Sequence, residues 1–376
     1  MTLTERQLNR TTLERQLLLD RKPLEVVEAV RRVTALQAQE PASPYIALWN
    51  RVKGFDPADL DEAFVDRSVL KASLMRITLH AVAADDYTPF QLGMIRTLRA
   101  ARLNDRRFQS TGLSIEEADD LVPHLLDFIA QPRSRRDIDE MLERQLGDVP
   151  DKHVFWALRT FAPLLHAPTG GPWSFTTNAP SYQAAPFDSD WDDQLAGLRR
   201  LIWRYLEGFG PASAADVAQF AMQRQAEIRP ALAGMEDQLV VRDGLNGRLL
   251  DVPEGFIADG DTPAPSRLLP MWDSVLLAYR DRNRIIPEEY RKAIIRRNGD
   301  VLPTVLVDGY VAGVWRPVEG GIEVTAFHAL PADAWSGLTE EATSLIELLA
   351  DREPLVYSRY GNWWKEMPGE RRILGE

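Results

Sequence analysis

Apolar side chains recur at helical spacing through the N-terminal third of the chain, and an amide interrupts one of these patterns. In the run 23–39, Val30 and Val33 lie on one helical face, and the next position on that face is Gln37. The pattern predicts a hydrophobic side chain at that position. We therefore interpret 23–39 as an amphipathic helix whose last turn carries two polar residues, Gln37 and Gln39.

Two interpretations of this amide pair remain open from the spacing alone. Residues two apart do not share a helix face, so Gln37 and Gln39 converge on one site only if the helix loosens at its end. Pro41 favours such loosening because it disfavours helical geometry at Glu40. In the alternative, Gln37 bonds a buried backbone group and Gln39 is solvated, since buried polar groups usually find hydrogen-bond partners.

The same order of elements recurs three times along the chain. Helices are expected at 4–20, 23–39, 43–52 and 57–66, then at 114–130, 134–146 and 152–164, and then at 191–206, 213–222 and 223–235. Paired extended runs follow each group, at 69–75 with 77–83, within 164–183, and at 239–243 with 248–252. Helices followed by a hairpin are typical of a winged helix. The pattern predicts an α+β protein with three tandem winged-helix units, at 1–90, 91–186 and 187–255.

The last third of the chain changes character after a proline-rich stretch at 253–270, which we interpret as a linker. Strands are expected at 274–279, 304–307, 311–318, 322–327 and 355–357, and a helix at 331–350. These elements predict a β-rich C-terminal subdomain over residues 256–376.

Composition narrows the class of protein. The chain has 376 residues, 45% of them hydrophobic, which predicts a globular protein with a substantial core. Cysteine is absent, which excludes disulfides, thiolate nucleophiles and cysteine-based zinc sites. No N-terminal apolar run indicates secretion or membrane insertion, so a cytoplasmic protein without a membrane partner is expected.

The charge is acidic overall but basic in two places. Lys and Arg number 44 against 56 Asp and Glu, a net charge of −12, which argues against a nucleic-acid partner on average. The stretches 94–107 and 279–297 are nevertheless rich in arginine. They indicate either a cationic groove on an acidic body or solvated helix faces with internal ion pairs.

Common cofactor chemistry finds no support in the sequence. No glycine-rich phosphate loop, nucleotide-binding fingerprint or serine nucleophile elbow is present, and the five histidines lack metal-ligand spacing. We expect no cofactor and no metal. Two classes of function remain: a winged-helix regulator that binds DNA without catalysis, and an enzyme that acts on a base.

Six segments of the chain together match one known family, namely Leu8–Leu19, Leu36–Pro41, Leu74–His80, Leu268–Asp273, Tyr279–Arg282 and Val307–Arg316. These segments resemble the AlkZ/YcaQ family of bacterial winged-helix DNA glycosylases. The resemblance covers nearly the whole chain and implies a concave DNA-binding surface built by three winged helices. It also implies that a Gln-x-Gln or Gln-x-Asp pair is catalytic. Gln37-Ala38-Gln39 has the first form, which resembles the branch associated with antibiotic biosynthesis and self-resistance.

The resemblance further implies a monofunctional DNA glycosylase that excises N7-alkylated purines from double-stranded DNA, and that unhooks crosslinks in some members. Base excision repair or toxin self-resistance is the implied role, and a monomer is expected because three winged units can encircle DNA in one chain. His166-Ala167-Pro168 matches the family's His-hydrophobic-Pro motif. The candidate DNA contacts are Arg76, His80, His166, Arg280, Arg282, Arg284 and Arg316.

Amides suit this chemistry because an N7-alkylated purine already carries a positive charge and leaves as a neutral base. A glutamine carbonyl can position water and stabilise the sugar cation, and its amide hydrogens can bind a phosphate or sugar oxygen. Asp85, Asp86 or Asp273 could supply a negative charge instead of the amides. We interpret Asp85 and Asp86 as the start of a helix, and Asp273 as part of a turn or as the partner of an arginine. No lysine is placed for Schiff-base chemistry, so strand cleavage is not expected. Bulky adducts favour an open groove over full extrusion of the damaged base.

Overall fold

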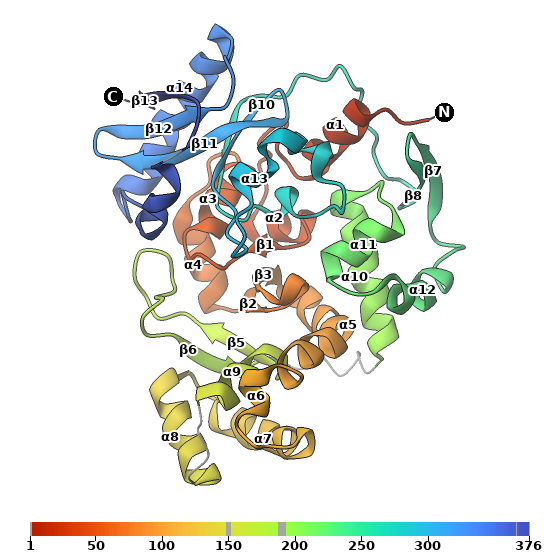
Figure 1. Ribbon diagram of the computed structural model, residues 1–376, viewed down its shortest axis with the longest axis vertical. Helices are drawn as coiled ribbons and strands as arrows, with labels where there is room; N and C mark the ends of the chain where they lie inside the picture. The colour runs from red at the N-terminus through yellow and green to blue at the C-terminus, as the bar shows by residue number, and fades with distance from the viewer. Residues whose placement is uncertain (1, 148–151, 187–192, 366, 376) are drawn as a thin grey trace.

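The computed structural model describes residues 2–147, 152–186, 193–365 and 367–375, and its elements confirm the predicted fold class (Figure 1). After helix α1 (Glu5–Arg15), the first winged unit follows in the upper centre of the view. Its elements are α2 (Val26–Arg32), β1 (Leu36–Gln37), α3 (Ser43–Trp49), α4 (Pro57–Val65), β2 (Val69–Ser73) and β3 (Leu79–Ala83). The strands form one antiparallel sheet in the order β1-β3-β2.

The second and third units repeat this order of elements. Helix α5 (Ala84–Leu103) and the short α6 (Arg106–Gln109) lead into the second unit, which forms the lower lobe of Figure 1. It contains α7 (Ile115–Phe128), β4 (Arg133–Ser134), α8 (Arg135–Leu146), α9 (Lys152–Phe161), β5 (Leu164–Ala167) and β6 (Ser181–Ala184), with the sheet order β4-β6-β5. The third contains α10 (Gln194–Phe209), α11 (Ala214–Ala221), α12 (Gln225–Ala233), β7 (Val240–Gly244) and β8 (Gly247–Asp251). A bridge between Ala212 and Leu250 replaces its first strand.

Local caps explain several of the helix starts. The side chains of Asp56, Ser134 and Ser213 each accept a hydrogen bond from a backbone N–H in the first turn of α4, α8 and α11. Such caps satisfy donors that have no partner within the helix. The predicted helix 191–206 begins within residues 187–192, which lie outside the described residues, and its described part, α10, begins at Gln194.

The C-terminal part is β-rich, as the sequence predicts. A five-stranded antiparallel sheet has the order β13-β12-β11-β10-β9, and α14 (Ala332–Ala350) packs against it. Its strands are β9 (Arg267–Leu269), β10 (Thr304–Val307), β11 (Tyr310–Val318), β12 (Gly321–Ala326) and β13 (Glu370–Leu374). Short helical segments link the strands: η2 (Ser274–Leu276), η3 (Arg282–Arg284), η4 (Glu288–Tyr290), α13 (Arg291–Ile294) and η5 (Ser358–Trp364).

Three predictions about elements in this part were wrong, and one strand was not predicted. Residues 274–279 begin with η2 instead of a strand, because the Asp273 carboxylate accepts from Val275 N and starts a helical turn. Residues 355–357 form no strand, and Tyr357 adopts a positive φ of 64° just before η5. The predicted linker 253–270 includes β9, which pairs with β10, and β13 was missed.

The units share hydrophobic cores. One core joins α2, α3 and α4 to the C-terminal sheet and α14, and the other joins α5 and helices of the second and third units to strands β2 and β3. The backbones of α5 and α10 approach closely at Gly93 and Gly197, where a Cβ on Gly197 would lie 2.5 Å from Pro89 O. The boundaries at 90, 186 and 255 therefore stay sequence predictions.

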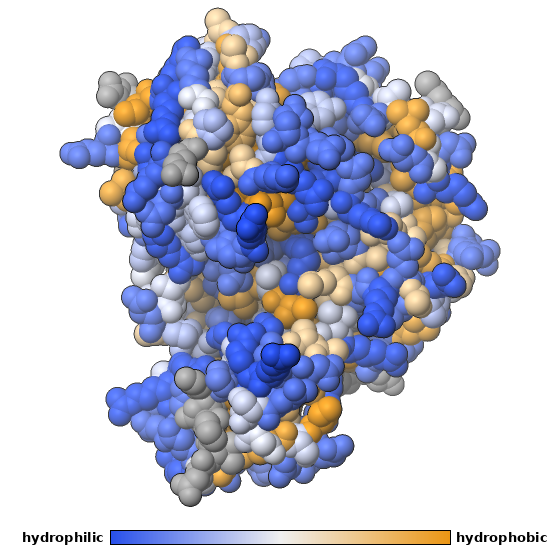
Figure 2. All heavy atoms as spheres, viewed as in Figure 1, coloured by the Kyte–Doolittle hydropathy of each residue, from blue (hydrophilic) through white to orange (hydrophobic). Residues whose placement is uncertain are grey.

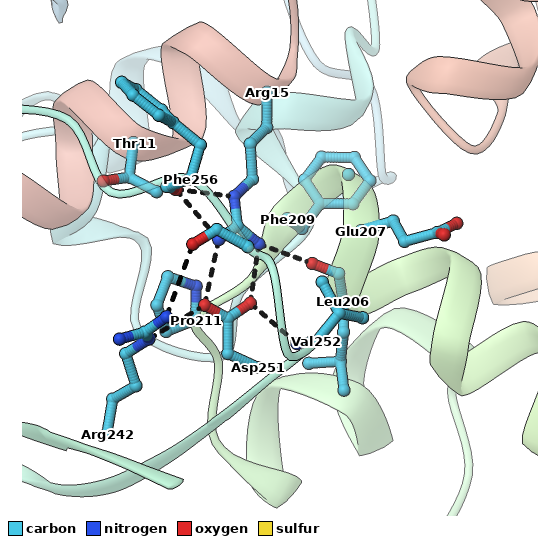
Figure 3. A network of polar contacts seen from close by, with 12 residues as sticks. Thr11, Arg15, Leu206, Glu207, Phe209, Pro211, Arg242, Asp251, Val252 and Phe256 are labelled. Carbon is cyan, nitrogen blue, oxygen red and sulfur yellow. Dashed lines mark hydrogen bonds and ion pairs between the residues drawn. The ribbon is translucent and has the colours of Figure 1, made fainter. Parts of the chain in front are cut away.

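A buried ion pair ties α1 to the third unit (Figure 3). Arg15 Nη1 and Nη2 donate to the two oxygens of Asp251 at 2.7 and 2.9 Å, and Nη1 also donates to Leu206 O. Asp251 is fully buried and accepts a further bond from Arg242 Nε at 3.1 Å. Removal of one partner would leave a buried charge uncompensated.

Within the described residues, no helix combines the length and the apolar character needed to cross a lipid bilayer.

Candidate functional site

Gln37 lies on a strand and not on a helix, which corrects the predicted helix 23–39. Helix α2 ends at Arg32, and Thr34 then adopts a left-handed φ of 74° while its hydroxyl donates to Arg204 O at 2.7 Å. The chain leaves this turn in extended form, and Gln37 pairs with His80 of β3. A hydrogen bond to a distant helix thus decides the end of α2.

The extended chain changes the relation between the two glutamines. The strand ends at Gln37 and Gln39 lies in the bend just after it, so the two amides do not depend on a loosened helix. The backbone N–H of Ala38 donates to Leu79 O at 2.9 Å, which extends the pairing beyond β1. Gln37 is 3% exposed, whereas Gln39 is exposed and accepts from Leu79 N in one long bond of 3.5 Å.

The Gln37 amide is held at both ends by side chains of one turn. Arg76 Nη2 donates to Gln37 Oε1 at 2.8 Å, and Gln37 Nε2 donates to Thr78 Oγ1 at 3.0 Å. Thr78 Oγ1 in turn donates to Met75 O at 3.2 Å. The described contacts of the Gln37 amide are thus with side chains, and not with a buried backbone group as the alternative had it.

The turn that carries Arg76 has unusual backbone geometry. Residues Met75–Ile77 form the 3₁₀ turn η1 between β2 and β3, in which Arg76 and Ile77 have positive φ values of 54° and 59°. Left-handed conformations are uncommon for residues other than glycine and cluster at functional sites. The predicted extended run 77–83 becomes a strand only at Leu79, and the polar side chains of Arg76, Thr78 and His80 meet beside this turn.

Arg76 is a half-buried cation without a carboxylate partner among the described residues. Its Nη1 is buried without a hydrogen-bond partner, and its Cζ lies 5.2 Å from the centroid of the Phe220 ring on α11. Burial, and after it the positive charge of Arg282, lower the pKa of Arg76 to about 10. Arg76 thus remains charged at neutral pH beside Gln37.

His80 is fully buried and neutral. Its Nε2 lies 3.0 Å from Arg76 Nη2, and its Nδ1 lies 3.0 Å from Thr78 O. Arginine only donates, so Nε2 accepts and Nδ1–H donates to the carbonyl. Burial, and after it the charge of Arg76, lower the pKa of His80 well below its usual 6.5. His80 therefore orients Arg76 and offers no proton for transfer.

Carboxylates near the glutamines in sequence are engaged elsewhere. Asp86 is fully buried and pairs with Arg200 and Arg204, and Asp85 pairs with Arg31 at 3.1 Å. Asp273 forms a buried bidentate pair with Arg51 at 2.8 and 2.9 Å, so it is an arginine partner, as one interpretation of the sequence had it. Glu40, directly after Gln39, pairs with Arg359 and accepts from Tyr360 Oη at 2.9 Å. Among the described contacts, no carboxylate bonds either glutamine.

Lys71 shows why a Schiff base is not expected at Gln37. The register pairs Gln37 with His80 and His80 with Ala72, so these three side chains share one face of the sheet. Lys71, one residue before Ala72, projects from the opposite face, where its Nζ lies 4.2 Å from the centroid of the Phe175 ring.

The other arginines predicted to contact DNA differ in whether their side chains already have partners within the protein. Arg280 is exposed, and Arg282 is half-buried on η3, with its Nε lacking a partner among the described residues. Arg284 stacks on Tyr279, with its Cζ 4.0 Å from the ring centroid, and donates to Pro211 O at 3.0 Å. Arg316 forms a bidentate pair with Glu323 at 2.9 and 3.0 Å across the β11–β12 hairpin. The last two have structural partners and are therefore weaker candidates.

His166 is not brought to Gln37. It lies on β5 against Tyr182, with ring centroids 4.7 Å apart. Burial, and then the charges of Lys71 and Arg159, lower the pKa of His166 well below 6.5. Its neighbour Lys71 is on the sheet face opposite Gln37, so His166 belongs to the junction between the first and second units.

One groove adjoins η1 at Ile77, and a second groove shares Ala215 and Arg280 with it. The first, which we call the α11 groove, has a volume of about 740 Å³, runs between α5, α11 and α12, and includes Ile77, Arg96, Arg224 and Arg280. The second, of about 460 Å³, lies between α1, the β7–β8 turn and η3 and is shared by cationic and acidic side chains. In Figure 2 a depression also separates the lower lobe from the body above it.

The basic stretches are thus partly ion-paired and partly free. Arg99 pairs with Asp119 at 2.5 and 2.8 Å, and Arg107 with Asp105 at 2.9 Å. Arg96 instead lies along the α11 groove and donates from Nε to Gln194 Oε1 at 3.0 Å, without an ion pair among the described residues. Sequence reasoning missed Thr78 as the partner of Gln37, although Thr78 lies between Arg76 and His80, two residues that were named as candidates.

Comparisons with known proteins agree with this architecture. The family model described as "DNA glycosylase AlkZ-like" matches residues 30–348. The chain is 26% identical over 353 residues to the interstrand DNA cross-link repair glycosylase of Streptomyces sahachiroi, covering 87% of this chain and 91% of that protein. The solved structure of the S. sahachiroi DNA glycosylase AlkZ is similar in fold, with a TM-score of 0.77 and 21% identity over 94% of this chain and 99% of that one. The match over most of the chain shows that this protein belongs to the AlkZ-like family of DNA glycosylases.

Proposed function

We propose that this DNA glycosylase hydrolyses the N-glycosidic bond of purines alkylated at N7 in double-stranded DNA, with Gln37 and Gln39 as its catalytic residues. The observation that carries the proposal is the pair of amides at the edge of the first winged unit, to which no carboxylate is bonded among the described residues. Such a site has neither a strong proton acceptor nor a general acid. It suits a substrate whose purine leaves without being protonated.

The two amides are placed for different tasks. The exposed Gln39 has an oxygen with only one long bond, so it can accept a hydrogen bond from the attacking water and face the developing sugar cation. Gln37 keeps one free Nε2 hydrogen, which can donate to an oxygen of the bound nucleotide. The product is a DNA chain with an abasic site, and among the described residues no lysine contacts the pair to cleave it.

DNA would reach this site along the α11 groove. Arg96, Arg224 and Arg280 supply positive charge there, and the groove continues to Ile77, directly after Arg76. Phosphate contacts of this kind provide affinity without reading sequence. Three winged units in one chain favour a monomer that surrounds the duplex, and an open groove leaves room for a bulky adduct without full extrusion of the base.

Crosslinked or bulky adducts are the finer part of the proposal. The S. sahachiroi relative is named for interstrand cross-link repair, and the Gln37-Ala38-Gln39 motif resembles the branch associated with self-resistance. We infer that this chain also unhooks N7-linked adducts in base excision repair or self-resistance.

The test compares substrates in one DNA duplex sequence. Single-turnover release of the base is measured for N7-methylguanine and for unmodified guanine at the same position, with an N7-linked crosslink as a third substrate. We expect release of N7-methylguanine and of the crosslinked base, and no release of guanine. Release of guanine at a comparable rate would overturn the leaving-group argument, and release of neither alkylated base would overturn the proposed substrate class.

A further inference from the structure

The Gln37 amide has one chemically allowed orientation, and Arg76 determines it. An arginine side chain has donors only, so the Gln37 atom that faces Arg76 Nη2 at 2.8 Å is the oxygen. The nitrogen then faces Thr78 Oγ1, which can accept because its own hydrogen points to Met75 O. Without Arg76, the amide could rotate by half a turn.

Arg76 is itself held in place from three directions. Its Nη2 also donates to His80 Nε2 at 3.0 Å, and His80 is fixed by its bond to Thr78 O. The Phe220 ring of α11 lies 5.2 Å from Arg76 Cζ, and the left-handed backbone of η1 aims the side chain inward. The guanidinium is therefore positioned between the first and third winged units.

This arrangement is energetically unfavourable for stability alone. A half-buried cation without a carboxylate partner loses part of its hydration without an ion pair in return. Arg76 Nη1 and Arg282 Nε are both buried without a hydrogen-bond partner among the described residues, and the two guanidiniums repel each other. A cation with this environment and a direct bond to Gln37 suggests a role in the reaction.

Chemically, a cation on the amide oxygen changes what Gln37 can do. A hydrogen bond from a guanidinium withdraws electron density from Oε1, which makes Oε1 a weaker acceptor and Nε2–H a stronger donor. Gln37 then serves the substrate through its free Nε2 hydrogen. The acceptor role falls to Gln39, which no cation contacts in the described residues.

We propose that Arg76 is a positioning residue that fixes and polarises the Gln37 amide, and that it acts through Gln37 and not by holding DNA. The proposal rests on the proposed function of Gln37 and Gln39. It replaces the DNA-contact role that the sequence suggested for Arg76.

Arg76→Met tests this role, because methionine fills similar space without donors or charge. We expect a fall of about 10- to 100-fold in the single-turnover release of N7-methylguanine, the effect of one charge-assisted hydrogen bond. The Kd for the duplex should change by less than about threefold. Arg76→Lys keeps the charge and one donor, and it should recover part of the lost rate.

A double variant separates action through Gln37 from a general effect. Gln37→Ala combined with Arg76→Met should be no slower than Gln37→Ala alone, because Arg76 then has nothing to position. Lys71→Met is the matched control, since it removes a buried cation from the opposite face of the same sheet. It should leave the excision rate unchanged.

Side-chain amide resonances provide a readout that does not depend on activity. The Gln37 Nε2 signal, identified by its loss in Gln37→Ala, should shift in Arg76→Met while the Gln39 signal stays in place. A normal rate in a folded Arg76→Met, a loss confined to DNA affinity, additive effects in the double variant, or an unmoved Gln37 signal would each overturn the proposal. Wild-type protein that fails to excise N7-methylguanine would instead count against the proposed function.

Discussion

Lys71→Met should stabilise the protein, by an amount that depends on pH. Lys71 is 5% exposed on β2 and makes no ion pair or hydrogen bond within the described residues. Burial lowers the pKa of Lys71 from 10.5 to about 7. Between these two pH values the unfolded chain binds a proton that the folded chain does not, so the folded state becomes more stable as pH rises.

The size of the effect follows from the two pKa values. At pH 7 the shift corresponds to a cost of about 4 kcal/mol to the folded state, and at pH 10 to about 1 kcal/mol. The contact with Phe175 offsets about 0.5 to 2 kcal/mol while the lysine is charged. Methionine removes both the cost of the buried amine and its contact with Phe175, and it buries a flexible apolar side chain. A net gain of about 2 to 4 kcal/mol in the free energy of unfolding is therefore expected at pH 7.

Urea unfolding of wild type and Lys71→Met at pH 7 and pH 10 measures this difference. The free energy of unfolding of the variant should exceed that of wild type clearly at pH 7 and only slightly at pH 10, with equal m-values. A gain that is the same at both pH values would refute the burial argument. So would a variant less stable than wild type at pH 7.

Two further predictions concern the buried ion pair and the pH dependence of catalysis. Asp251→Ala should lower the free energy of unfolding by about 3 to 5 kcal/mol, because it leaves Arg15 buried and unpaired, and Asp251→Asn should cost less. Thermal or urea unfolding of both variants checks this, and equal, small losses would contradict it. The single-turnover rate on N7-methylguanine should be flat between about pH 6.5 and 8, because the amides do not titrate and burial lowers the pKa of His80 well below 6.5. A rate that follows a single ionisation within that window would show that a titrating group takes part.

Hydrophobic spacing and capping residues were sufficient to predict most of the fold. Ser134 and Ser213 start helices where the sequence places them, because their caps involve only neighbouring residues. The end of α2 could not be predicted in this way. It depends on the bond from Thr34 to Arg204 O, which is 170 residues away in sequence.

The candidate site was predicted in part and for an incomplete reason. Gln37 and Gln39 were identified by an amide in an apolar pattern, but Gln37 lies on a short strand and Gln39 in the bend after it, and not on a loosened helix. Arg76 could be singled out as basic, yet its bond to Gln37 depends on a left-handed turn that no local pattern indicates. The pairing of Arg316 with Glu323, in contrast, follows from the register of a hairpin that the sequence does predict.

The most direct test of the central claim is single-turnover excision of N7-methylguanine by wild type, Gln37→Ala and Gln39→Ala, with folding and DNA affinity measured for each. Both substitutions should slow excision by at least about 10²-fold, as loss of a preorganised transition-state contact does, while the Kd for DNA stays near that of wild type. If both folded variants bind DNA normally and release the base at the wild-type rate, the amide pair is not catalytic and the account is wrong.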